Sequence, residues 1–266
     1  MRAPVAPLVE GGMIAWRNLL HVRRSVDWVF AAVVQPIMFV LLFGFIFGGL
    51  LGGAAYREFL VAGIVVQTLA FNSAFTVLGL ATDLREGMID RLRSLPISRA
   101  AVMVGRTLSD LAVSVVALVV MSLCGLLIGW RIRGSVLDAI TAYCVLLLFA
   151  FAMSWIGALI GLVAPSPEVA QSAGLIWLTP LTFVSSGFVP ESSLPAPLRA
   201  VAEWNPVTAV INAVRGLFGN ANPPRIPLPT GWPAEHALGY AVACSLVIIA
   251  VFIPLSMRAY RRIRTR

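Results

Sequence analysis

Long apolar runs dominate this chain. Six segments each contain about twenty or more consecutive residues without Asp, Glu, Arg, Lys or His, the length with which a helix crosses the hydrocarbon core of a bilayer. Only 12% of the 266 residues are charged and 59% are hydrophobic, whereas soluble domains carry about 25% charge. We therefore exclude a water-soluble globular protein and expect an all-α membrane protein with six transmembrane helices, at residues 28–49, 59–81, 101–130, 136–163, 169–189 and 237–257.

The sequence contains no lysine, and all 20 of its basic residues are arginine. A phosphate-binding P-loop needs a lysine, so the chain cannot bind ATP through that motif, and lysine nucleophiles are excluded as well. The three cysteines lie inside apolar runs without metal-ligand spacing, and neither histidine belongs to a metal or hydrolase motif. We expect no catalytic residue, no metal site and no cofactor on this chain.

The arginines predict an orientation, because cytoplasmic segments next to membrane spans keep an excess of positive charge. If the N-terminus is inside, 14 of the 20 arginines fall on the cytoplasmic side and 6 on the other. An even number of spans then places both termini in the cytoplasm, in a multi-pass protein of the cell membrane. The charge follows membrane boundaries and accompanies no DNA-binding motif, so we expect no nucleic-acid partner.

Residues 83–96, between the second and third predicted spans, have the pattern of a short amphipathic helix. Asp83 and Glu86 resemble a capping box at its start, and Pro96 ends it. The apolar stripe consists of Leu84, Met88, Leu92 and Leu95, and the charged remainder includes Arg85, Glu86, Asp90 and Arg91. The nearly balanced charges leave two interpretations open: a helix on the lipid surface, or a docking surface for another protein.

Two further segments lie outside the predicted spans. Residues 8–26 mix apolar residues with arginines, which predicts either an amphipathic helix in the cytoplasmic interface or a simple basic anchor before the first span. Residues 190–233, on the outer face, contain short apolar pieces separated by prolines. We expect these pieces to lie against the membrane or to dip into it as a re-entrant segment, and not to form a seventh span.

Three segments together resemble one protein family. They are residues 85–99 (REGMIDRLRSLPISR), residues 185–195 (SSGFVPESSLP) and residues 204–216, which contain WNPVT and end in Arg215 and Gly216. The segments resemble signatures of the type-2 ATP-binding-cassette (ABC) export permeases, most closely the daunorubicin-resistance (DrrB-like) branch, and the likeness extends over essentially the whole chain. Met88 departs from the pattern, since threonine is common there.

The resemblance implies a permease subunit that moves an amphipathic drug, antibiotic or lipid-like substrate out of the cell. It implies a second permease, identical or homologous, as partner, and two copies of a separate nucleotide-binding ATPase subunit that carries ATP and Mg. Residues 83–96 would then be the coupling helix that contacts the ATPase. The absence of lysine agrees with a chain that depends on such a partner.

Two other functions were weighed. An ion-gradient-driven exporter needs ionisable groups in the middle of its spans, and the nearest such group is Asp110, which we expect to pair with Arg106 one turn away. An integral-membrane transferase acting on a lipid-linked substrate needs acid, base or metal-binding groups gathered at one membrane face, whereas the acidic residues here are scattered.

Polar and aromatic residues inside otherwise apolar spans are candidates for a translocation path, because amphipathic compounds need stacking faces and a few hydrogen-bonding groups. Hydrogen bonding between helices is the alternative role for each of them. The candidates in the second and fifth predicted spans are Gln67, Phe71, Asn72, Phe75, Thr179, Phe183 and Ser185.

Overall fold

The computed structural model describes residues 34, 37–42, 54–88, 91, 99–187, 191, 194–220, 229 and 231–262, and every regular element in these ranges is a helix. The elements are α3 (Ala54–Arg85), α5 (Arg99–Leu127), α6 (Val136–Val163), α7 (Pro167–Phe183), α8 (Ala196–Glu203), α9 (Pro206–Phe218), α10 (Trp232–Glu235) and α11 (Ala237–Arg262). The predicted interfacial helix at 8–26 and most of the first predicted span at 28–49 lie outside the described residues. The all-α class is confirmed for the described part of the chain.

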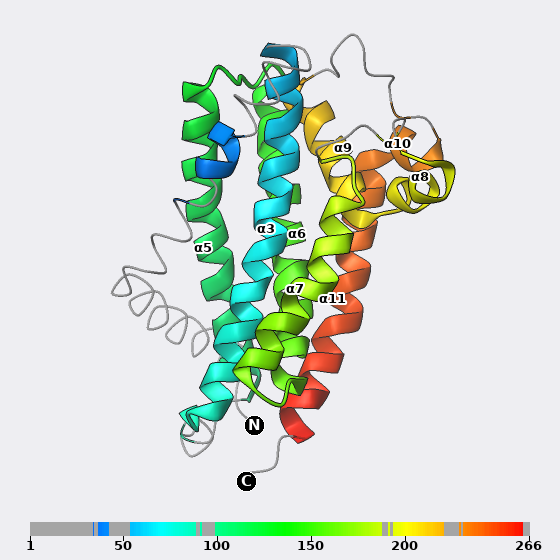
Figure 1. Ribbon diagram of the computed structural model, residues 1–266. Coiled ribbons are helices and arrows are strands. Elements are labelled where there is room, and N and C mark those ends of the chain that lie inside the picture. Colours follow the sequence, from blue (N-terminus) through cyan, green and yellow to red (C-terminus); the bar gives the residue numbers. More distant parts are fainter. Residues whose placement is uncertain are drawn as a thin grey trace.

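Within the described residues, the helices α3, α5, α6 and α11 are long and apolar enough to cross a membrane. They run side by side with α7, whereas α8, α9 and α10 gather near one end of the bundle, here called the α9 end (Figure 1). The opposite end carries the last turns of α3 and α11 and the first turn of α5. We call it the arginine-rich end, because its described residues include Arg85, Arg91, Arg258, Arg261 and Arg262.

Local sequence sets several helix bounds. α6 has the predicted limits 136–163, and Ser135 and Asp138 form a capping box at its start. α5 ends at Leu127, three residues before the predicted limit, because the chain turns at Gly129, whose φ of +97° favours glycine. α11 extends beyond the predicted limit, to Arg262.

The bounds of α3 and α7, the helices that carry the predicted path residues, differ more from the predicted ones. α3 is longer than the predicted 59–81 at both ends, because Tyr56 packs into the buried core at one end and Leu84 packs against a buried cluster at the other. α7 is shorter than the predicted 169–189 and ends at Phe183. Pro180, in its last turn, has no N–H to donate, which weakens the helix there. At 17 residues, α7 is about 26 Å long.

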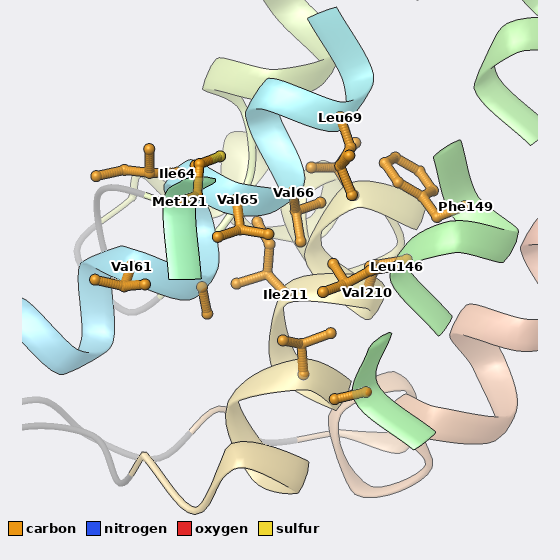
Figure 2. Close-up of a cluster of buried hydrophobic side chains, with 14 of the residues drawn as sticks. Val61, Ile64, Val65, Val66, Leu69, Met121, Leu146, Phe149, Val210 and Ile211 are labelled. Atoms are coloured by element: carbon orange, nitrogen blue, oxygen red, sulfur yellow. The ribbon is translucent and has the colours of Figure 1, made fainter. Parts of the chain in front are cut away.

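The core at the α9 end is built around α9. Five residues of α3 (Val61, Ile64, Val65, Val66 and Leu69) meet Met121 of α5, Leu146 and Phe149 of α6, and Val210 and Ile211 of α9 (Figure 2). Val207, Val210, Ile211 and Val214 are completely buried. With 13 residues, α9 is too short to cross a bilayer, and it inserts between α3, α6 and α11 instead.

Two glycines bring α6 close to α3. A Cβ added at Gly157 would lie 2.5 Å from the Ser73 carbonyl oxygen, and one at Gly161 would lie 2.6 Å from that of Val77. Both distances are far below van der Waals contact, so only glycine permits this approach. The Gly157 and Gly161 pair, at G-x-x-x-G spacing, therefore serves packing within the chain.

Candidate coupling and translocation sites

The connection from α3 to α5 begins with a sharp break at the arginine-rich end. Glu86 and Gly87 form a turn after α3, and Gly87 has a φ of +68°, in the left-handed region that favours glycine. The Arg91 amide then donates to the Gly87 carbonyl at 3.1 Å, with helical spacing. The predicted helix start and capping box at Asp83 are therefore wrong: Asp83 belongs to the last turn of α3, where it pairs with Arg106 of α5.

The side chains of this connection divide into an inner and an outer group. Leu84 and Met88 pack against a buried cluster to which α3, α5, α6 and α11 all contribute. Arg85, Glu86 and Arg91 are exposed. Half of the predicted apolar stripe thus anchors the connection to its own bundle, and the described outward surface is charged. The remaining predicted coupling residues lie outside the described ranges: Asp90, Leu92, Leu95 and Pro96.

A second connection lies beside the first at this end. Arg85 Nη1 lies 2.7 Å from Glu168 Oε1, at the start of α7. Both side chains are mostly exposed, at 65% and 70%, and such a surface ion pair contributes little to stability. The pair shows that the end of α3 and the start of α7 lie next to each other at the arginine-rich end.

The predicted path residues of α3 lie partly on an accessible side of the helix. Phe71, Asn72 and Phe75 are half-buried, whereas Gln67 is buried. Phe71 packs against the core at the α9 end. The carbonyl oxygen of Phe75 accepts a hydrogen bond from Arg106 at 3.2 Å, so the backbone at this position has a structural role as well.

The predicted path residues of α7 are divided between its outer face and its end. Thr179 and Phe183 are exposed, the latter at 58%. Ser185, just past the end of the helix, is buried, and its hydroxyl donates to the Thr182 carbonyl at 2.5 Å. α7 packs against α3, with Gly174 next to Val77. The fold therefore brings the two predicted path helices side by side but encloses Gln67 and Ser185 in the interior.

Asn205 joins the end of α7 to the start of α9. Its side-chain oxygen accepts from the Val207 amide at 2.8 Å and so caps α9. Its amide nitrogen donates to the carbonyls of Leu181 and Val184, at 2.7 and 2.6 Å, and so satisfies two groups at the end of α7. The Thr208 hydroxyl accepts a hydrogen bond from the Ser186 amide, just past the end of α7. Asn205 and Thr208 of the WNPVT segment thus fix the start of α9 at the end of α7.

Arg215 joins α9 to α3 and to the segment after α7 from inside the bundle, where it is 5% exposed. Its Nε donates to the Phe59 carbonyl at 3.1 Å and its Nη2 to the Ser186 carbonyl at 2.7 Å. The guanidinium also lies 3.5 Å from the centre of the Phe59 ring, a cation–π contact. Asn212, half-buried one turn earlier, donates to Glu191 at 3.0 Å, and burial raises the pKa of the Glu191 carboxyl.

The connection between α5 and α6 holds the other end of α9. Trp130 Nε1 donates to the Asn220 side-chain oxygen at 2.7 Å, and the Arg133 amide donates to the Phe218 carbonyl at 2.8 Å. Gly219 supplies the left-handed residue, with φ +67°, that ends α9. α9 is therefore fixed at both of its ends by hydrogen bonds to other elements.

The predicted pairing of Arg106 with Asp110 is confirmed, with Nε and Oδ1 3.6 Å apart. The inserted position of α9 and the burial of Arg215 were not predicted from the sequence. One signal was present: Arg215 is the only charged residue within the apolar stretch 206–218, and a lone charge in such a helix needs an internal partner.

Comparisons with known proteins agree with this architecture. The family model described as ABC-2 type transporter matches residues 11–218. The chain is 33% identical to the daunorubicin resistance ABC transporter permease protein DrrB1 of Streptomyces coeruleorubidus, over 92% of this chain and 84% of that protein. It is 25% identical to the probable doxorubicin resistance ABC transporter permease protein DrrC of Mycobacterium tuberculosis, over 93% and 87% of the two chains. It is 24% identical to the inner membrane transport permease YadH of Escherichia coli, over 81% and 84%.

The matched region includes the α3–α5 connection, the WNPVT segment and all described helices except α10 and α11. Together with the resemblance of these segments to export-permease signatures, this match identifies the chain as a multi-pass membrane permease. The chain belongs to the ABC-2 type transporter family.

Proposed function

We propose that this chain is the membrane-spanning subunit of an ATP-driven exporter for an amphipathic drug of the daunorubicin or doxorubicin kind. It works with a second permease, identical or homologous, and with two copies of an ATPase subunit that bind ATP and Mg. The relatives named for resistance to these two drugs support the substrate class. The lysine-free sequence supports the division of labour, because this chain cannot supply a P-loop.

The observation that carries the proposal is the form of the α3–α5 connection. Leu84 and Met88 anchor it in the bundle while Arg85, Glu86 and Arg91 face outward. A connection with a charged outer surface and an anchor in the bundle can transmit the movement of a docked protein to the helices. We therefore assign the arginine-rich end to the cytoplasm, with six spans and both termini on that side, in agreement with the excess of arginine there.

The open face of α7 is where we place the second permease and the drug path. Thr179 and Phe183 are exposed there, beside the half-buried Phe71 and Phe75 of α3. Aromatic rings with interspersed hydroxyl groups suit a flat amphipathic molecule. In a dimer of permeases, two such faces would enclose a path along the symmetry axis, with Asn72 at its side.

The test is to purify the chain in mild detergent from its native membrane together with the ATPase that accompanies it, and to measure ATP-driven daunorubicin uptake into reconstituted vesicles. We expect a stoichiometric ATPase and uptake that stops without ATP. Arg91→Glu should release the ATPase, because it reverses a charge on the outward surface. Arg258→Glu is the matched control, since Arg258 is also exposed at the arginine-rich end but lies on α11.

Uptake that continues on a proton or sodium gradient without ATP would refute the proposal in favour of an ion-driven exporter. Release of a transferred group from a lipid-linked substrate, with no drug uptake, would favour the transferase.

A further inference from the structure

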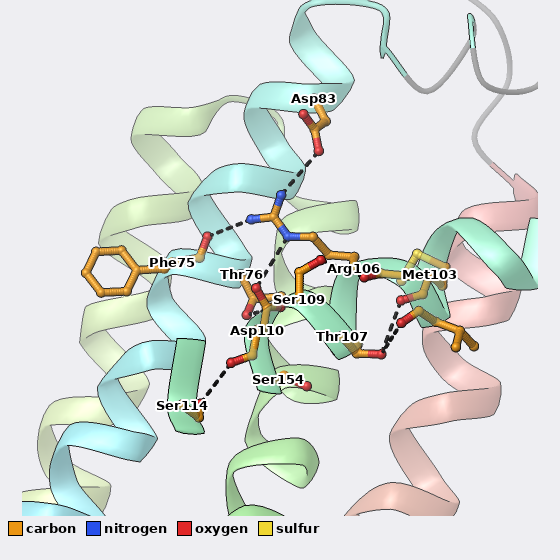
Figure 3. A network of polar contacts seen from close by, with 12 residues as sticks. Phe75, Thr76, Asp83, Met103, Arg106, Thr107, Ser109, Asp110, Ser114 and Ser154 are labelled. Atoms are coloured by element: carbon orange, nitrogen blue, oxygen red, sulfur yellow. Dashed lines mark hydrogen bonds and ion pairs between the residues drawn. The ribbon is translucent and has the colours of Figure 1, made fainter. Parts of the chain in front are cut away.

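A partly buried polar network joins α3 to α5 near the arginine-rich end (Figure 3). The guanidinium of Arg106 is its centre. Nη1 lies 3.4 Å from Asp83 Oδ2, Nη2 donates to the Phe75 carbonyl at 3.2 Å, and Nε lies 3.6 Å from Asp110 Oδ1. The second oxygen of Asp110 accepts from the Thr76 hydroxyl at 2.8 Å. One side chain of α5 is thus held at positions that span two turns of α3.

The backbone of α3 leaves space for this side chain. A Cβ added at Gly79 would overlap three atoms of the Arg106 guanidinium, which are the nearest heavy atoms to it. Gly79 therefore lies directly beneath the guanidinium. Arg106 and Asp110 are each only 17% exposed, so solvent screens their attraction much less than it screens the surface pair of Arg85 and Glu168.

The network occupies a particular place along the chain. Asp83 is two residues before the end of α3, and α5 begins at Arg99, directly after the connection proposed to contact the ATPase. Force applied to residues 86–98 reaches both flanking helices. Unless something joins these helices, part of the movement would be lost as their ends separate.

Packing alone joins α5 to the bundle weakly. Only 28% of the most apolar stretch of α5 is buried in the bundle, against 72% of the corresponding stretch of α3. The exposed side of α5 is apolar, with Val115, Val116, Val119 and Leu123. A planar guanidinium with donors in several directions can hold two carboxylates and a carbonyl at once, which a lysine ammonium does less well.

We propose that Arg106 is a positioning residue that makes the arginine-rich ends of α3 and α5 move as one body when the ATPase acts on the connection between them. This inference rests on the proposed function, and it adds the element through which the connection moves the spans. Asp83 and Asp110 hold the guanidinium on its two sides, and Gly79 provides the space it occupies.

Two variants perturb the network in different ways. Arg106→Gln removes the charge, and Gly79→Ala keeps the charge but displaces the guanidinium. Their matched controls are Arg258→Gln, at an exposed position of the same end, and Gly239→Ala, where a Cβ would meet nothing within 4 Å. A milder third variant, Thr76→Val, removes only the hydroxyl that supports Asp110 and keeps every charge.

The measurement is daunorubicin transported per ATP hydrolysed by the reconstituted complex. We expect Arg106→Gln and Gly79→Ala to lower this ratio about fivefold or more, the lower range of typical coupling between sites, with the ATPase still bound and the controls unchanged. Adding Gly79→Ala to Arg106→Gln should cause no further loss, because both changes act through the same guanidinium.

A substrate-independent readout follows the helices themselves. Spin labels at Thr82 of α3 and Leu108 of α5, in a chain whose three cysteines are replaced by serine, should keep one distance with and without ATP in the parent. In Arg106→Gln the distance distribution should broaden when ATP is added.

A merely structural network would give a different result: lower thermal stability, with an unchanged transport ratio and an unchanged label distance. That result in Gly79→Ala and Thr76→Val overturns the inference even if Arg106→Gln fails to assemble. If the parent complex itself shows no ATP-driven transport and no ATP-dependent movement of α3, the proposed function fails instead.

Discussion

Replacing Arg215 by leucine tests how α9 is held to α3 and to the segment that follows α7. The variant keeps much of the side-chain volume but leaves the carbonyls of Phe59 and Ser186 without their donor in a buried site. Each unsatisfied carbonyl costs about 1–3 kcal/mol, and the lost contact with the Phe59 ring costs about 1 kcal/mol more. The variant also avoids burying a charge, which offsets part of this cost.

These contributions leave a net loss of about 3 kcal/mol, at the lower end of what removal of one partner from a buried charged pair costs. For a chain of this size a loss of 1 kcal/mol lowers the melting temperature by roughly 2–4 °C. We therefore expect Arg215→Leu to melt roughly 6–12 °C below the parent. Arg215→Lys should fall between the two, because an ammonium can bond to the carbonyls but cannot stack on the ring as a planar group.

The assay is thermal denaturation of the purified protein in detergent, followed by tryptophan fluorescence. Arg199→Leu is the control, since Arg199 is exposed on α8 and such surface changes stay within about 0.5 kcal/mol. If Arg215→Leu melts within about 2 °C of the parent, the carbonyl contacts do not hold α9 in place and the reasoning is wrong.

Three further predictions concern the packing of helices on α3, the carboxyl of Glu191 and the proposed drug path. Gly161→Ala should lower the melting temperature markedly, because its Cβ would overlap the α3 backbone, whereas Gly174→Ala should not, because its Cβ would make ordinary contacts at 3.6 Å. Glu191→Gln should stabilise the protein at neutral pH. Burial raises the pKa of this carboxyl, so its ionised form destabilises the fold above the raised pKa. The parent should therefore gain stability as the pH falls through the raised pKa. The amide of the variant keeps an acceptor for Asn212 but does not titrate, so melting curves of the variant should show a flatter pH dependence. Phe71→Ala should change daunorubicin-stimulated ATPase activity without loss of the ATPase, and unchanged stimulation would remove α3 from the path.

The sequence predicted the α9 end less well than the spans. The apolar pieces between residues 190 and 233 were expected to lie against the membrane or dip into it, but the sequence did not predict that Val207, Val210 and Ile211 lie in the centre of the core. Their helical spacing is compatible with any apolar surroundings, lipid or protein. The WNPVT segment was recognised only as a resemblance, because the function of Asn205 depends on carbonyls that lie 21 and 24 residues earlier in the chain.

At the arginine-rich end the sequence predicted a break near Pro96 and a helix start at Asp83. α3 continues to Arg85 and the chain turns at Gly87, so the predicted helix start at Asp83 is wrong, whereas Pro96 lies outside the described residues. Asp83 resembles a helix cap when only its neighbours are considered, since aspartate is a good N-cap. Its partner, however, is Arg106, which lies 23 residues away on another helix, and this contact keeps Asp83 inside α3.

By itself the sequence determined that the chain is an all-α membrane protein with long apolar helices, because the length and charge of a run decide whether a helix can enter lipid. It also determined the local caps at Ser135 and Asn205, since capping needs only neighbouring residues. Only the tertiary structure decided where the buried charges are satisfied. Arg215 bonds to a carbonyl 156 residues away. Such pairs arise from the way the helices pack, which the apolar periodicity of a single helix does not determine.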